Sequence, residues 1–240
     1  MKLSFFKDFF IDLFWPQFCL GCQKEGALIC SNCFSLIEIL EYQFCPFCKS
    51  PQRVLNKGTC PTHRSKNLKG LFAATSYQNF LLQRLIKNFK YQPFLKTLAQ
   101  PLVFLIITHF LLSDKEEVFQ QEKNNSLFIP IPLFPSRQRW RGFNQAEEIT
   151  KFLSFYFEIP YQSNNLIKIK KTQPQIELKE KEREKNIKDS FRILKIKEIE
   201  KKKIFLVDDV FTTGATMEEA AKTLKRAGAK EVWGIVIAKE

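Results

Sequence analysis

Two adjacent aspartates, Asp208 and Asp209, stand where an apolar run gives way to a turn in the stretch IFLVDDVFTTGAT at 204–216. The run predicts a buried strand, and the turn leads into a helix. Carboxylates at a strand end accept hydrogen bonds from the vicinal hydroxyls of a ribose, and a helix N-terminus favours an anion. The turn residues are Thr212, Thr213, Gly214, Ala215 and Thr216. We therefore predict a sugar-phosphate site; a cap of threonines and a metal-binding acidic pair are the alternatives.

Seven cysteines and one histidine form four pairs, each with two residues between its members. This spacing is typical of zinc knuckles in a reducing compartment rather than of disulfides. Eight ligands would complete two tetrahedral sites, and sites without an open position are structural. The predicted ligands are Cys19, Cys22, Cys30, Cys33, Cys45, Cys48, Cys60 and His63.

The pairing of these knuckles is open. Sequential pairing puts the first four ligands in one site and the last four in the other, but the spacing also allows an interleaved pairing. His63 has an alternative role as a surface histidine unrelated to metal. The knuckles are basic, so they are candidates to contact nucleic acid phosphates, although solvated lysines are the commoner explanation.

Three arginines, Arg137, Arg139 and Arg141, follow the apolar run LFIPIPL at 127–133. We expect that run to form a central parallel strand and the arginines to lie in the loop after it, where α/β proteins bind ligands. Guanidinium groups match phosphate oxygens bidentately, which makes a pyrophosphate clamp a reasonable role. Trp140 among the arginines suits stacking on single-stranded nucleic acid; packing against the next helix is the alternative.

The elements that position these residues follow from the hydrophobic pattern. We expect a strand at 71–77, helices at 80–91 and 101–112, a helix that stops at Gly228, and a final strand at 232–238. Lys87 and Lys90 lie on the first of these helices, and solvent exposure is favoured over a place near the substrate. The polar stretch 114–125 predicts a surface loop. The fold class is therefore α/β, with a parallel sheet flanked by helices.

The length of 240 residues allows one α/β core and a small accessory module. We place an aromatic amphipathic helix (about residues 2–14) and the cysteine module in 1–66, and the α/β domain in 67–240. The chain shows no signal-peptide pattern, and its apolar run at 101–112 is too short to span a bilayer. These features predict a cytoplasmic protein without a membrane span.

A net charge of +13 and a pI of about 9.4 favour an anionic partner, either nucleic acid or phosphorylated substrates. Lysine-rich composition alone is the other explanation. Residues 165–203 carry much of the excess. Within them we expect either a mobile basic cover whose lysines and arginine close on phosphates, or a solvated helix with ion pairs. The residues concerned are Lys170, Lys171, Arg183 and Lys185.

The stretch VDDVFTTGAT resembles the ribose-phosphate motif of type I phosphoribosyltransferases. Together with RGFNQA, the residues 172–191 and the cysteine knuckles, it is similar to the ComF (ComFC) branch of competence-associated proteins. The resemblance covers nearly the whole chain. It implies a phosphoribosyltransferase-like domain behind a double zinc ribbon, although that family usually closes the last knuckle with a cysteine where this chain has His63.

The resemblance implies that Asp208 and Asp209 hold the ribose of phosphoribosyl pyrophosphate, with Mg²⁺, and that the turn at 212–216 holds its 5′-phosphate. No segment identifies an acceptor base. Two functions are therefore expected as alternatives: a DNA-handling protein of natural competence that binds single-stranded DNA, and a working phosphoribosyltransferase. A zinc-bearing adaptor for a competence helicase is a third, weaker alternative.

Overall fold

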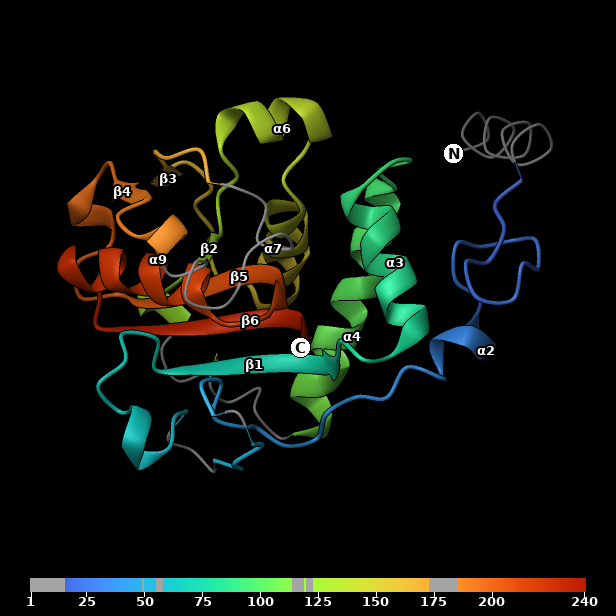
Figure 1. Ribbon diagram of the computed structural model, residues 1–240, viewed down its shortest axis with the longest axis horizontal. Helices are drawn as coiled ribbons and strands as arrows, with labels where there is room; N and C mark the ends of the chain where they lie inside the picture. Colours follow the sequence, from blue (N-terminus) through green and yellow to red (C-terminus); the bar gives the residue numbers. More distant parts are fainter. Residues whose placement is uncertain (1–15, 49, 55–57, 114–118, 120–122, 173–184) are drawn as a thin grey trace.

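The computed structural model describes residues 16–48, 50–54, 58–113, 119, 123–172 and 185–240. Its centre is a parallel sheet of four strands in the order β1-β6-β5-β2 (Figure 1). The strands are β1 (Gly70–Ser76), β2 (Ser126–Pro130), β5 (Lys203–Phe211) and β6 (Glu231–Lys239). The predicted helix at 2–14 and most of the predicted basic cover lie outside the described residues.

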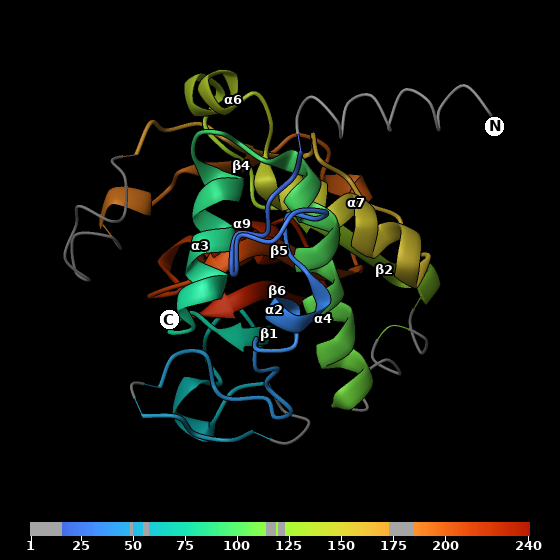
Figure 2. The same cartoon turned by 90° about the vertical axis from the view of Figure 1, so that its right-hand side faces the viewer.

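Helices cover both faces of the sheet (Figures 1 and 2). One face carries α3 (Phe80–Lys90), α4 (Ala99–Leu112) and α7 (Gln145–Phe157), and the other carries α9 (Ala215–Arg226). Side chains alternate along β5: Phe205 and Val207 join the core on the α4 and α7 side, whereas Ile204 and Leu206 join the core on the α9 side. Both faces are therefore buried, and the predicted α/β fold with a parallel sheet is confirmed.

The strand β2 ends the four-stranded sheet, so the prediction that it is central is wrong. Its outer edge is nevertheless paired. The N–H of Phe128 donates to the carbonyl of Pro160 at 2.9 Å, and the carbonyl of Phe128 accepts from the N–H of Gln162 at 3.0 Å. All of β2 is buried, which explains why its sequence reads like an interior strand.

The arginine run forms a short helix, α6 (Pro135–Arg141), instead of the predicted loop. Pro135 stands at its start, where a missing N–H costs nothing, and Gly142 ends it in the left-handed conformation with φ of 78°. Farther along the chain, β3 (Leu166–Lys168) and β4 (Phe191–Ile193) pair as an antiparallel ribbon. This ribbon holds the start of the basic region in place.

Phe119 lies inside the stretch predicted to be a surface loop, yet it is buried in the core. Its ring centroid lies 4.7 Å from that of Phe110 and 4.8 Å from that of Phe205. The loop prediction is therefore wrong at this position, because one aromatic residue in a polar stretch completes an aromatic cluster formed by distant elements.

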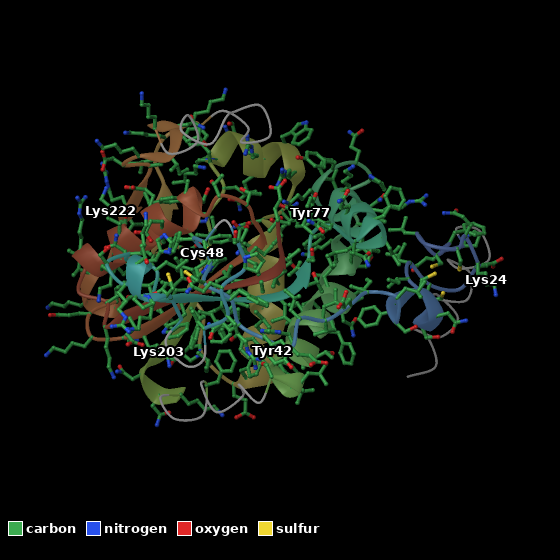
Figure 3. The ribbon with its side chains drawn as sticks, turned by 60° about the horizontal axis from the view of Figure 1, so that its bottom comes forward. Lys24, Tyr42, Cys48, Tyr77, Lys203 and Lys222 are labelled. Atoms are coloured by element: carbon green, nitrogen blue, oxygen red, sulfur yellow. The ribbon has the colours of Figure 1, made fainter. Side chains whose placement is uncertain are left out.

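The predicted metal ligands fall into two groups on different sides of the α/β core; Figure 3 labels Lys24 near the first and Cys48 in the second. The first group includes α2 (Ser31–Phe34), and Leu20 and Leu28 pack against the core that α3, α4 and α7 share. The connecting segment pairs with β1, since the N–H of Leu40 donates to the carbonyl of Ala74 at 2.8 Å. The cysteine knuckles therefore flank the core on two sides.

The second group lies against β1 and β6. Gly58 has φ of 73°, and a Cβ there would lie 2.2 Å from the carbonyl oxygen of Lys69, so its backbone approaches the start of β1 very closely. The side-chain amide of Gln43 donates to the carbonyl of Leu71 at 3.3 Å, and Lys239 Nζ donates to the carbonyl of Cys45 at 3.4 Å. This group is thus attached to strands from both ends of the chain.

Candidate functional site

The predicted sugar-phosphate residues lie where β5 ends and α9 begins. Gly214 precedes α9 in the left-handed conformation, with φ of 79°. A Cβ at this position would lie 2.3 Å from the ring of Phe211, so the turn requires glycine. The first N–H groups of a helix have no acceptor within the helix. An anion site at the turn 212–216 stays a prediction, and the turn's place at the start of α9 is compatible with it.

The acidic pair lies in the same strand, close to its carboxyl end. Asp209 is buried and Asp208 is half-buried. Asp208 Oδ1 accepts a hydrogen bond from the N–H of Asp209 at 2.9 Å, and Asp209 Oδ1 accepts one from the N–H of Val210 at 2.7 Å. These bonds fix both carboxylates at the end of β5.

Lys90 forms an ion pair with the second of these aspartates. Its Nζ lies 2.8 Å from Asp209 Oδ1, and its side chain is 21% exposed. Solvent exposure, the favoured prediction for both lysines of α3, is therefore wrong for Lys90, whereas Lys87 is exposed. Lys90 follows Ile86 by four residues and so flanks the buried stripe of the helix.

Burial, followed by the negative charge of Asp209, raises the pKa of Asp208 to about 7, although Lys90 opposes the shift. Near neutral pH Asp208 is therefore divided between its neutral and its ionised form. A cation or a set of hydroxyl donors at this position would stabilise the ionised form of Asp208.

The three predicted arginines have different surroundings, and their role as a pyrophosphate clamp stays a prediction. Arg141 faces the acidic pair: burial lowers its pKa, and the negative charge of Asp209 is the largest opposing effect. Its Nη1 donates to Gln145 Oε1 at 2.9 Å, and its buried Nε has no partner within the described part of the chain. Arg137 lines a cavity, and Arg139 is exposed on the other side of α6.

A cavity with a volume of about 350 Å³ has a positively charged wall. Burial, followed by the charge of Arg137, lowers the pKa of Lys168 to about 8, while the charge of Asp208 opposes this shift. Arg137 and Lys168 therefore lie in the same electrostatic field as the acidic pair. The lining residues are Leu133, Phe134, Ser136, Arg137, Lys168, Lys171 and Thr172.

Lys168 and Tyr77 are site residues that the sequence reasoning missed. Lys168 ends β3, and the alternation in LIKIK could have indicated that it faces away from Ile167. Tyr77 directly follows β1, and burial raises its pKa while Lys90 lowers it. Its place after a parallel strand is the signal that could have identified it.

The eight predicted metal ligands form two groups of four, each able to hold a metal ion, with their ligand atoms within 4.8 Å of one another. Cys19, Cys22, Cys30 and Cys33 form one group, and Cys45, Cys48, Cys60 and His63 form the other. The grouping is sequential along the chain. In the second group, His63 Nδ1 lies 3.5 Å from Cys45 Sγ and 3.2 Å from Cys60 Sγ.

The thiols of these groups influence one another strongly. Burial, followed by hydrogen bonds from neighbouring thiols, raises the pKa of Cys33 and that of Cys48 to about 12. Burial also raises the pKa of Cys19, but backbone hydrogen bonds from Cys30, Cys22 and Gly21 outweigh it and lower that pKa to about 6. Four ligands this close cannot all lose their protons unless a cation compensates the charge.

Comparison with known proteins supports this combination of parts. The phosphoribosyl transferase domain model matches residues 146–240. The chain is 31% identical over 223 residues to competence protein F of Haemophilus influenzae, which covers 90% of this chain and 89% of that protein. It is 31% identical over 167 residues to DNA utilization protein YhgH of Salmonella typhimurium, and the match covers 63% of this chain and 70% of that protein. It is 24% identical over 210 residues to competence protein ComFC of Streptococcus pneumoniae, covering 88% and 87%.

Proposed function

We propose that this chain, which belongs to the ComF (ComFC) family of competence proteins, binds phosphoribosyl pyrophosphate and single-stranded DNA during DNA uptake. The observation that carries the first part is the junction of β5 and α9. There an acidic pair and a glycine turn at a helix N-terminus lie together, and the charge of Asp208 acts on Lys168 in the wall of the cationic cavity. Each part matches one part of the ligand: ribose, 5′-phosphate and pyrophosphate.

The roles follow from chemistry. Asp208 and Asp209 would accept hydrogen bonds from the ribose hydroxyls, and the turn at 212–216 would donate to the 5′-phosphate. Arg137 and Lys168 would contact the pyrophosphate from the cavity wall. Carboxylate oxygens suit Mg²⁺, and a bound cation would favour the ionised form of Asp208, whose pKa is raised by burial and then by the charge of Asp209. Asp208 and Asp209 would hold Mg²⁺, and the bound cation would neutralise negative charge of the pyrophosphate.

Zinc fits both cysteine groups. A tetrahedral zinc with bonds of about 2.3 Å to sulfur and 2.0 Å to nitrogen separates two sulfurs by about 3.8 Å, and a sulfur from a nitrogen by about 3.5 Å. Cys22 Sγ and Cys30 Sγ are 3.6 Å apart, as are Cys48 Sγ and Cys60 Sγ, and Cys48 Sγ lies 3.6 Å from His63 Nδ1. With four protein ligands each, both sites would be structural.

Single-stranded DNA binding is supported by the net charge of +13 and by the exposed side of α6. Trp140 is 59% exposed there and is next to the exposed Arg139. Its ring centroid lies 5.3 Å from that of Phe94, and the two rings are nearly perpendicular. An exposed ring among cations can stack on a base while the cations contact phosphates. The relatives named for competence and DNA utilization are consistent with this role.

Titration calorimetry with phosphoribosyl pyrophosphate and Mg²⁺ tests the ligand. We expect the parent to bind, and the double variant Asp208→Asn and Asp209→Asn to lose measurable binding. Asp189→Asn is the matched control, because Asp189 is an exposed aspartate outside the site. A parent chain that does not bind, with both metal sites filled, would refute the proposed site.

Fluorescence polarisation with single-stranded oligonucleotides tests the second part. We expect affinity that falls steeply between low and moderate salt, because cations of the protein displace condensed counterions. Trp140→Ala should weaken binding by about tenfold. Phe155→Ala is the control, since Phe155 is an 86% exposed aromatic on α7. No affinity, or affinity insensitive to salt, would remove DNA binding.

A working phosphoribosyltransferase is the second candidate function, and the cationic cavity favours it. Arg137 and Lys168 could stabilise charge on departing pyrophosphate as the ribose carbon becomes cationic. Incubation of labelled phosphoribosyl pyrophosphate with a panel of bases should then release pyrophosphate, and the double aspartate variant should not. Binding without release across a broad panel would favour a recognition role over catalysis.

A further inference from the structure

A row of aromatic contacts connects the second cysteine group to the phosphate turn. The ring centroid of Phe47 lies 5.8 Å from that of His63 on one side and 6.3 Å from that of Phe211 on the other. Phe211 is buried, and its ring lies directly against Gly214, where a Cβ would come within 2.3 Å. A ligand of the metal group and the turn are thus separated by two side chains.

A second connection joins the same two regions by hydrogen bonds. Glu218, in the first turn of α9, accepts from the N–H of Asn67 at 2.9 Å and from its side-chain amide at 2.8 Å. Its other oxygen accepts from the N–H of Leu68 at 3.0 Å. Asn67 and Leu68 follow the last cysteine knuckle. Two contacts therefore hold the start of α9. One is the packing of Phe47 against Phe211, and the other is the set of hydrogen bonds that Glu218 accepts from Asn67 and Leu68.

We propose that the second cysteine group positions the phosphate turn, with Phe47 as the positioning residue that acts through Phe211 on Gly214. This inference rests on the proposed function for its ligand, phosphoribosyl pyrophosphate. Metal at Cys45, Cys48, Cys60 and His63 fixes the ring of His63. The fixed knuckle holds Phe47 against Phe211, and packed rings transmit such a constraint because a well-packed core deforms little. Metal loss at this group would then weaken anion binding at a turn that contains no metal ligand.

The chain offers a matched control. Phe34 is next to the ligand Cys33 in the first group, and Phe47 is next to the ligand Cys48 in the second. The ring centroid of Phe34, however, lies 5.8 Å from that of Phe104 in α4, away from the turn. Phe47→Ala should weaken phosphoribosyl pyrophosphate binding by about tenfold, whereas Phe34→Ala should leave it unchanged. Phe47→Tyr keeps the ring and should restore the affinity. Native mass spectrometry establishes that each variant retains both zinc ions.

Hydrogen exchange supplies a readout that needs no ligand. In Phe47→Ala the backbone amides of 212–216 should exchange several-fold faster than in the parent, while those of α7 keep the rates of the parent. If Phe47→Ala loses its metal, Phe47→Leu replaces it in the comparison. Exchange tests the coupling even in a chain that fails to bind phosphoribosyl pyrophosphate, so the two proposals can fail separately. Unchanged exchange at 212–216 in a variant that holds both zinc ions would overturn the coupling.

Discussion

The acidic pair shows how much one residue's neighbours determine its chemistry. Asp208 and Asp209 are adjacent and have the same side chain, yet their surroundings differ, and burial followed by the charge of Asp209 raises the pKa of Asp208 to about 7. Asp209 forms an ion pair with Lys90, whose Nζ lies 2.8 Å from Asp209 Oδ1. For Asp208, burial and the negative charge of Asp209 both disfavour the ionised form. The site is thus prepared for a ligand that brings donors or a cation to Asp208.

A pH-dependent stability follows from this shift. The pKa of Asp208 is about 7 in the folded chain and near the ordinary value of 3.8 when the chain is unfolded, so folding takes up a proton between these pH values. The stability that Asp208 contributes is present at low pH and is lost as the pH rises through about 7. We expect Asp208→Asn to be more stable than the parent above that pH, by the order of 2 kcal/mol, and the difference to shrink toward about pH 5.

Thermal melts of the ligand-free protein across this pH range give the measurement. Asp189→Asn serves as the control, because its exposed side chain lies away from the pair. A stability difference for Asp208→Asn that is the same at every pH would contradict the assignment of the shift to this carboxylate.

At the scale of elements, the junction of β5 and α9 depends on a glycine for two separate reasons. Gly214 and Gly142 both adopt the left-handed conformation, with φ of 79° and 78°. A Cβ on Gly214 would collide with Phe211, whereas a Cβ on Gly142 would meet nothing within 4 Å. The two positions therefore separate backbone strain from steric conflict.

We expect Gly142→Ala to cost about 1 kcal/mol of stability, from backbone strain alone. Gly214→Ala should cost about 2–4 kcal/mol, since Phe211 must also move, and should weaken binding of phosphoribosyl pyrophosphate. Denaturant unfolding of both variants measures the difference. Equal losses of stability in the two variants would show that Phe211 can move aside at no cost in free energy.

The elements were predictable wherever local pattern determines them. The strand and helix around Asp208 and Gly214 follow from an apolar run, a turn and a periodic segment that lie next to each other in sequence. The helical form of the arginine run was not predicted, although Pro135 begins it and Gly142 follows it, because three charges within five residues resemble a loop. The phase of α3 could have distinguished Lys90 from Lys87, but only if the buried face of the helix is already known.

At the scale of the whole molecule, the predictions that failed concern residues whose place depends on contacts with distant parts of the chain. Phe119 is one aromatic residue in a polar stretch, and only rings from other elements make it part of the core. The place of the cysteine groups on two sides of the α/β core also depends on long-range pairing, such as that of Leu40 with Ala74. Within the described residues, every helix is too short or too polar to span a membrane, as predicted.

The zinc content of single-ligand variants should distinguish the two cysteine groups. We expect two zinc ions per chain, one in Cys22→Ala, and one in His63→Ala. Zinc should be released as the pH falls, because protons compete for the thiolates and for His63. Removal with a chelator should lower the melting temperature, since each group packs against the core. Two zinc ions retained in His63→Ala would show that His63 is not a ligand.

The position of β6 has a consequence for synthesis on the ribosome. β6 follows every other strand in sequence, yet it lies between β1 and β5. It also carries Lys239, which donates to the carbonyl of Cys45 in the second cysteine group. While residues 231–239 are still inside the exit tunnel, β1 has no neighbour in the sheet, and the second group lacks that contact. The sheet therefore closes in one late step, and a chain released before Glu231 should accumulate as aggregate or be degraded.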